Sequence, residues 1–144
     1  MTRKIAKKRS RFVGGCLCRA IRYRVAGNPV DSGYCHCRLC RGSAGAPVMA
    51  WSTFPISTFA FTRGKARTFH SSRYAFRQFC GRCGTQLTFR KARGAKFVDV
   101  NVVSLDRPAA IVPQYHIWTR SRLPWFDTRD ELPRHRDGGP DVLA

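Results

Sequence analysis

The chain has 144 residues, a length typical of a single domain, and 43% of them are hydrophobic, which excludes a disordered chain. No apolar run is long enough to span a bilayer, and the basic N-terminus lacks the apolar stretch of a secretory signal, so we expect a cytoplasmic protein without membrane contact. The formal net charge of +19 attracts polyanions, but charge of this kind defines neither a fold nor a particular partner.

The positive charge comes mostly from arginine, with 21 Arg and 6 Lys spread along the whole chain. One interpretation is an arginine-rich surface that reflects the coding bias of the source. The other is a surface for nucleic acid or another acidic ligand, and nucleic acid would then be bound without sequence specificity. The charge alone does not separate the two.

Three regions follow from the distribution of polar and apolar residues. Residues 1–11 are rich in Lys and Arg and predict a solvated, disordered tail. A folded domain is expected over residues 12–133. After it, residues 134–144 are polar and contain Gly and Pro, so they predict a C-terminal tail.

The first half of the domain contains short strand and turn patterns. Apolar and charged residues alternate over 20–25, which predicts a half-buried strand. Asp31-Ser32-Gly33 has the composition of a turn. Residues 34–45 predict a cysteine-rich metal-binding turn that runs into a short helix, and residues 48–53 predict another strand.

The second half continues in the same way. Residues 58–62 and 67–70 flank Arg63-Gly64, which predicts a β-hairpin. Further strands are predicted over 75–79, 85–90, 96–103 and 115–118. Since no segment has a sustained helical period, the sequence predicts a mainly β fold of short antiparallel strands with little helix.

Seven cysteines in a reducing compartment indicate metal binding or catalysis rather than disulfides, and four of them have the spacing of one metal site. Cys80 and Cys83 form a Cys-x-x-Cys-Gly turn in which Gly84 can adopt the positive φ that directs backbone amides at sulfur. Cys16 and Cys18 are closer in sequence and need a bend, for which Gly14 and Gly15 offer conformational freedom. Together the two pairs complete a tetrahedral Cys₄ zinc site of the structural kind.

An alternative for the same residues is a redox-active dithiol at Cys80 and Cys83, with Cys16 and Cys18 merely buried. The sequence around Cys80 lacks the βαβ pattern of thioredoxin-like proteins, which favours the metal site.

The other three cysteines, Cys35, Cys37 and Cys40, predict a second zinc site with an open coordination position. A helix that begins at Arg38 would place Cys37 and Cys40 at its N-terminal end, beside Arg38 and Arg41, and this favours thiolate over thiol. Three protein ligands leave one position for water or an external thiolate, as in catalytic zinc sites. A fourth protein ligand would make the site structural, and the sequence offers His36, His70 and His116 for that role.

The cysteine segments also carry a family resemblance. Residues 14–18, 35–41 and 77–87 resemble, in order and spacing, the glutathione-dependent formaldehyde-activating enzyme family, which includes the domain of centromere protein V. The resemblance extends through 103–108 and 116–125 and covers about residues 12–133.

The resemblance implies a β-tent fold of the Mss4-like kind with two zinc ions per chain. It implies a structural zinc on Cys16, Cys18, Cys80 and Cys83, and a second zinc on Cys35, Cys37 and Cys40 near the binding site of glutathione. The implied activity is that of a carbon–sulfur lyase that interconverts formaldehyde plus glutathione with S-hydroxymethylglutathione. On this view Cys35, Cys37 and Cys40 are the catalytic residues. The residues themselves, rather than the resemblance, suggest Arg38, Arg41 or Arg77 as a partner for the carboxylates of glutathione, and a solvated surface position is the alternative for each of them.

Two other functions are compatible with the sequence, since one fold hosts many functions. The first is a basic, non-catalytic zinc module that binds nucleic acid or a protein, although no recognition helix follows either cysteine turn. The second is a metal-stabilised interaction domain without chemistry. The sequence contains no carboxylate pair that would serve as an independent catalytic group, and Asp99 is expected to face solvent.

Overall fold

The computed structural model describes residues 10–143. Of the tail predicted over residues 1–11, residues 1–9 lie outside this part of the chain, and Arg11 is the first residue of a strand. Two β-sheets form most of the molecule, so the predicted mainly β fold is confirmed. The smaller sheet has three antiparallel strands in the spatial order β1 (Arg11–Gly15), β2 (Arg22–Ala26) and β5 (Phe59–Arg63). None of the helices formed by residues 10–143 is long and apolar enough to cross a membrane.

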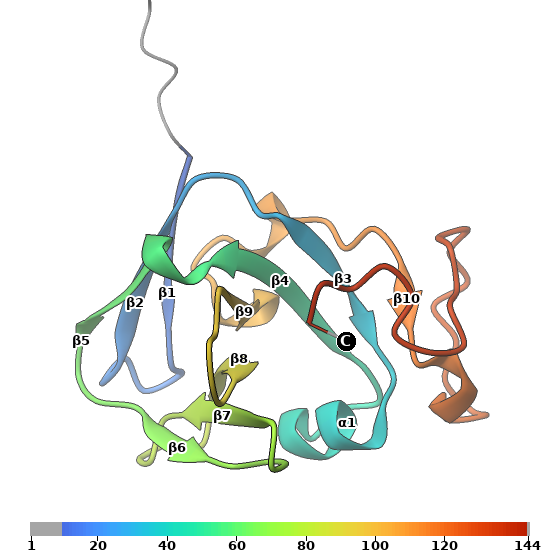
Figure 1. The fold of residues 1–144 in the computed structure, drawn as a ribbon, viewed down its shortest axis with the longest axis horizontal. Helices are drawn as coiled ribbons and strands as arrows, with labels where there is room; N and C mark the ends of the chain where they lie inside the picture. Colours follow the sequence, from blue (N-terminus) through green and yellow to red (C-terminus); the bar gives the residue numbers. More distant parts are fainter. Residues whose placement is uncertain (1–9, 144) are drawn as a thin grey trace, which may run out of the picture.

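The larger sheet curves around the other side of the molecule (Figure 1). All of its neighbouring strands are antiparallel except β10 and β3, which are parallel. Its seven strands follow the spatial order β10 (His116–Ile117), β3 (Asp31–Cys35), β4 (Met49–Pro55), β9 (Phe97–Asn101), β8 (Gln86–Lys91), β7 (Ala75–Phe79) and β6 (Arg67–Phe69).

Helical structure is confined to short connections. The α-helix α1 (Arg38–Ala44) follows β3, and its C-terminal end is closed by Gly45 at a φ of 61°. Four 3₁₀ turns complete the fold: η1 (Ile56–Thr58), η2 (Val102–Ser104), η3 (Pro108–Ala110) and η4 (Thr119–Ser121).

The main hydrophobic core lies between the two sheets. The alternation predicted over residues 20–25 is observed, since Ile21, Tyr23 and Val25 are buried in this core. Val98 and Val100 enter the same core from β9. A second, smaller apolar cluster forms on the other side of the larger sheet and contains Cys35, Cys40, Met49, Trp51, Tyr115 and Ile117.

Two local predictions are wrong. Asp31-Ser32-Gly33 is not a turn but the first part of β3, because it pairs with β4. The Ser32 hydroxyl donates to the Trp51 carbonyl, and Gly33 lies opposite Trp51, where a Cβ would be 3.0 Å from the ring. The hairpin around Arg63-Gly64 is also wrong, because β5 pairs with β2 and β6 pairs with β7. The chain therefore passes from one sheet to the other at Gly64, where φ is 71°.

Candidate metal centres and the adjoining cavity

The four cysteines Cys16, Cys18, Cys80 and Cys83 come together at one end of the main core. All four sulfurs lie within 4.8 Å of one another, with 3.6 Å between Cys16 and Cys18 and 3.8 Å between Cys18 and Cys80. Sulfurs that coordinate one Zn²⁺ tetrahedrally are expected about 3.8 Å apart. The donor set and its spacing therefore fit a metal ion without rearrangement.

Two tight turns build this cluster. In the turn after β7, the amide of Gly84 donates to the Cys80 carbonyl and Gly84 has a φ of 79°, as its sequence position predicts. In the turn after β1, Arg19 takes the left-handed conformation, with a φ of 63°. The backbone amide of Ile21 donates to the Cys16 sulfur at 3.2 Å, which is the kind of bond that favours a thiolate.

Gly14 and Gly15 have a different role from the predicted one. Both belong to β1, and neither is among the glycines with positive φ. A Cβ on Gly15 would lie 2.2 Å from the Ile21 carbonyl oxygen, and one on Gly14 would lie 2.5 Å from the Ser104 carbonyl oxygen. These glycines are required because the neighbouring backbone passes so close to β1.

The three cysteines Cys35, Cys37 and Cys40 form a second cluster at the junction of β3 and α1. Cys35 ends β3, Cys37 is the N-cap of α1, and Cys40 lies in its first turn, so a single short segment brings their sulfurs within 4.8 Å of one another. The predicted short helix is thus observed. The Cys37 sulfur accepts a hydrogen bond from the Cys40 amide at 3.3 Å.

Electrostatics favour a thiolate in this cluster. Hydrogen bonds from the Cys35 and Cys40 thiols, together with backbone amides of α1, hold the pKa of Cys37 well below its usual value. A guanidinium nitrogen of Arg77 lies 3.5 Å from the Cys40 sulfur. The side chain of Arg77 is almost fully buried, so its charge is poorly screened at this position.

No histidine among residues 10–143 joins the three sulfurs as a fourth ligand. His36 and His116 are fully buried and bond to each other, with 2.8 Å between Nε2 of His36 and Nδ1 of His116. The Nε2 atom of His116 lies 3.0 Å from Asp130. His70 packs against the Phe76 ring instead. The three histidines considered for a fourth ligand therefore have other partners.

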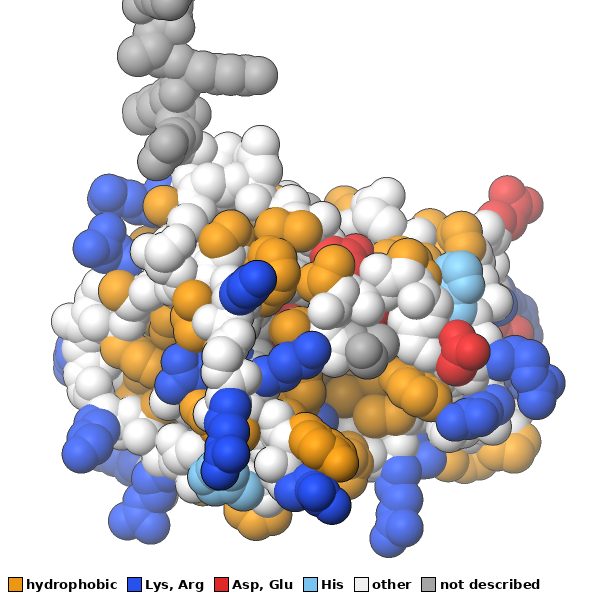
Figure 2. All heavy atoms as spheres, in the orientation of Figure 1, with side chains coloured by type: hydrophobic (Ala, Val, Ile, Leu, Met, Phe, Trp, Pro, Cys, Tyr) orange, Lys and Arg blue, Asp and Glu red, His pale blue; other side chains and the backbone are white. Residues whose placement is uncertain are grey.

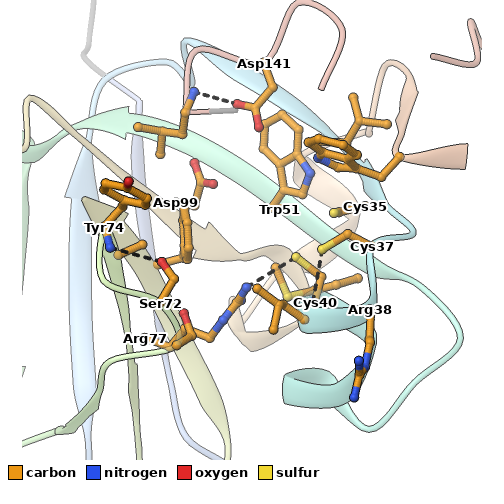
Figure 3. Close-up of a pocket in the computed structure, with 18 of the residues that line it drawn as sticks. Cys35, Cys37, Arg38, Cys40, Trp51, Ser72, Tyr74, Arg77, Asp99 and Asp141 are labelled. Carbon is orange, nitrogen blue, oxygen red and sulfur yellow. Dashed lines mark hydrogen bonds between the residues drawn. The ribbon is translucent and has the colours of Figure 1, made fainter. Parts of the chain in front are cut away.

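A cavity of about 560 Å³ opens beside the three-cysteine cluster (Figure 3). The Cys35, Cys37 and Cys40 side chains form part of its wall. Most of the remaining wall is apolar, and a few polar side chains interrupt it. The apolar residues include Met49, Trp51, Phe89, Ile117 and Trp118, and the polar or charged ones include Arg38, Ser71, Arg77, Lys91, Asp99 and Asp141.

The three arginines considered for ligand binding are placed differently. Arg38 and Arg77 line the cavity. Arg41 instead donates from Nε to the His36 carbonyl oxygen at 3.0 Å, so it holds the cysteine segment in place.

Asp99 is the residue that the sequence did not predict for this site. It was expected to face solvent, but only 6% of it is exposed and it lies on the cavity wall. The Thr53 hydroxyl donates to its Oδ1 at 2.5 Å, and burial raises the pKa of Asp99 to about 8. The sequence does contain a signal for this placement, since Asp99 is a single acidic residue between the apolar residues of a central strand.

The fold and the paired cysteine clusters define a small, mainly β protein with two potential metal sites. The family model for the glutathione-dependent formaldehyde-activating enzyme matches residues 11–121, and the chain belongs to this family.

Two individual proteins are similar to this chain. A protein of Schizosaccharomyces pombe named as an uncharacterised lyase is 32% identical over 83 residues, which are 58% of this chain and 60% of that protein. The match therefore spans less than two thirds of that relative. A crystal structure of a Rhodobacter sphaeroides protein has a TM-score of 0.56 and 24% identity, and covers 70% of this chain and 97% of its own. This second likeness supports the fold alone.

Proposed function

We propose that this protein is a zinc-dependent carbon–sulfur lyase that forms and cleaves an adduct between formaldehyde and a thiol of the glutathione type. The observation that carries the proposal is the contrast between the two cysteine clusters. Four thiols form a complete donor set next to the main core, whereas three thiols lie on the wall of a large cavity. A complete set suits a structural zinc, and an incomplete one suits a catalytic zinc.

The two cysteine clusters would hold zinc ions with different roles. Cys16, Cys18, Cys80 and Cys83 would hold the structural zinc. Cys35, Cys37 and Cys40 would hold the catalytic zinc, which when bound supplies a Lewis acid that favours the thiolate form of the substrate.

The cavity walls would bind the rest of the thiol substrate. The cationic side chains of Arg38, Arg77 and Lys91 are placed to attract its carboxylates. The apolar walls formed by Trp51, Ile117 and their neighbours exclude water and strengthen these contacts. The volume of the cavity is far larger than formaldehyde requires, which agrees with a thiol of peptide size as the second substrate.

The proposal is tested by the rate at which the protein interconverts formaldehyde and its glutathione adduct. Exchange NMR with ¹³C-labelled formaldehyde measures this rate at equilibrium, with and without the zinc-loaded protein. We expect a clear acceleration by the wild type and none by the triple variant Cys35→Ser, Cys37→Ser, Cys40→Ser. An unaccelerated exchange with a wild type that contains two zinc ions would reject the function.

A further inference from the structure

Asp99 occupies a defined place in the sheet next to the cavity. It lies in the middle of β9, opposite Thr53 of β4 on one side and Phe89 of β8 on the other. Its neighbours Val98 and Val100 are buried in the main core. Since successive side chains of a strand point to opposite faces, Asp99 points away from that core and toward the cavity (Figure 3).

A row of side chains connects Asp99 to the three-cysteine cluster. Phe89 pairs in register with Arg77 of β7, and the Arg77 guanidinium lies 4.8 Å from the centre of the Phe89 ring. The same guanidinium reaches the Cys40 sulfur. Asp99 and Cys40 thus face one cavity, with Arg77 and Phe89 forming the wall between them.

Only one oxygen of the Asp99 carboxyl group has a hydrogen-bond partner among residues 10–143. Its Oδ1 accepts from Thr53, which is itself fully buried. Its Oδ2 has no hydrogen-bond partner among residues 10–143, and Asp99 takes part in none of the ion pairs formed there. One oxygen therefore remains available to a molecule in the cavity.

The surroundings of Asp99 keep this carboxyl group protonated near neutral pH. Burial is the main cause, and the nearby carboxylates of Asp31 and Asp141 add to it. Arg77 and the Thr53 hydroxyl act in the opposite direction without offsetting the burial, so the pKa of Asp99 rises to about 8. Lys91 also lines the cavity and interacts with Asp141.

We propose that Asp99 is the catalytic acid and base that transfers the proton of the adduct's hydroxyl group; this inference rests on the proposed function. In adduct formation the thiolate sulfur attacks the carbonyl carbon of formaldehyde, a C–S bond forms, and the π electron pair moves to oxygen. That oxygen takes the proton of the Asp99 carboxyl group and becomes the hydroxyl. The proton released earlier from the thiol returns, through solvent, to the Asp99 carboxylate.

In cleavage the same steps run backwards, and the overall reaction is RSH plus formaldehyde to RSCH₂OH. The Asp99 carboxylate removes the hydroxyl proton, the C=O bond forms, and the C–S electron pair leaves with sulfur. The hydroxyl oxygen lies only two bonds from the sulfur, so a thiol bound at the three-cysteine cluster would present it to the cavity. The proton would then pass between this hydroxyl group and Asp99 across the cavity, directly or through water.

The test compares Asp99→Asn with the wild type in the exchange experiment, because Asn keeps the shape and accepts from Thr53 but carries no transferable proton. We expect a loss of about 100-fold or more in the accelerated rate, in the range of general acid–base catalysis. Glutathione binding, measured by calorimetry, should change less than about twofold. The wild-type rate of adduct formation should fall above about pH 8 as Asp99 ionises, and this decline should be absent from the residual rate of Asp99→Asn.

Three further variants keep the test decisive. Asp127→Asn, at an exposed carboxylate outside the cavity, is the matched control and should retain the wild-type rate. Asp99→Ser provides a second variant if Asp99→Asn does not fold. Asp141→Asn tests the competing carboxyl group of the same cavity, and a loss of rate and of the alkaline decline with that variant instead would overturn the assignment to Asp99.

The outcomes also separate this inference from the proposed function. A wild type without acceleration rejects both. A wild type that accelerates the exchange, together with an Asp99→Asn variant of the same rate and pH profile, rejects only the role of Asp99.

Discussion

The burial of Asp99 lowers the stability of the folded protein as the pH rises. A carboxyl group without a cationic partner is costly to bury in charged form, so the folded protein binds a proton that the unfolded chain releases. The usual pKa of the group is 3.8, and in the folded protein it is about 8. Folding therefore becomes less favourable as the pH rises between these two values.

We expect Asp99→Asn to remove this pH dependence. The variant should be similar in stability to the wild type at pH 4, where the carboxyl group is protonated in the folded protein, and more stable by about 2 kcal/mol or more at pH 9. Urea unfolding at a series of pH values measures the difference. A wild type that is stabilised between pH 5 and pH 8 relative to Asp99→Asn would contradict the raised pKa.

The sequence predicts how the seven cysteines are grouped, but it does not predict that Asp99 is buried. The difference has a physical reason. The division of the thiols into four and three depends on short spacings and local turns, which the sequence contains. Whether Asp99 faces solvent or a cavity depends on what covers the second face of β9. Segments distant in the sequence, including α1 and the residues Asp141 and Leu143, line the cavity on that face, so alternation along β9 could not reveal it.

Among the elements, β1 carries a tight packing constraint. It leads into Cys16 of the four-cysteine cluster, and it runs against the backbone near Ile21 and Ser104. The strand was not among those predicted from the sequence, because its Arg-Phe-Val-Gly-Gly composition is unlike that of a regular strand.

Gly15→Ala should destabilise the protein by about 2 kcal/mol or more, because the new Cβ would collide with the Ile21 carbonyl. It should also weaken metal retention at the four-cysteine cluster, since Cys16 is the next residue. Gly42→Ala is the matched control. It lies inside α1 with nothing within 4 Å of the new Cβ, so it should be neutral or stabilise by about 0.5–1 kcal/mol. Thermal unfolding and competition with a zinc chelator measure both effects.

Strand β10 connects the larger sheet to the C-terminal part of the chain. Its residue His116 donates its amide to the Pro133 carbonyl and accepts from the amide of His135. Its ring stacks on Tyr34 and contacts both His36 and Asp130. The region predicted as a tail from residue 134 thus lies along this strand, and no short-range signal in the polar sequence indicates that contact.

His116→Ala should therefore cost about 3 kcal/mol, because it leaves a cavity and removes the partner of the buried His36 Nε2. His70→Ala, at an exposed position beside Phe76, should change the free energy of unfolding by less than about 0.5 kcal/mol. Chemical denaturation of the two variants provides the comparison. Equal stability of His116→Ala and the wild type would show that the C-terminal contact is not part of the stable fold.

At the scale of the whole molecule, the outer surface and the cavity differ in the charged residues that they contain. Figure 2 shows Lys and Arg side chains distributed around the visible face, with few acidic ones between them. The wall of the cavity, by contrast, contains both cationic residues and carboxyl groups among its apolar residues. The basic surface can attract polyanions of any sequence, but the cavity is where the described residues offer a specific site.

The two cysteine clusters should respond oppositely to the loss of a ligand, and this is the most direct test of the whole arrangement. Cys80 is buried in the main core, and its cluster connects the smaller sheet to the end of β7, so Cys80→Ser should release metal and unfold the protein. The thiols of Cys35, Cys37 and Cys40 all come from one short segment beside the cavity, so a metal ion held by them would not crosslink distant parts of the chain. The triple Ser variant of this cluster should lose one of two zinc ions and keep its fold.

Metal counting by mass spectrometry under native conditions and circular dichroism measure the two responses together. The single variant should show a disordered spectrum, and the triple variant a wild-type spectrum with one zinc. The same contrast should appear with a graded chelator, which should remove the three-cysteine zinc first because fewer protein ligands hold it. Equal behaviour of the two variants would mean that one kind of site, not two, is built from these seven thiols.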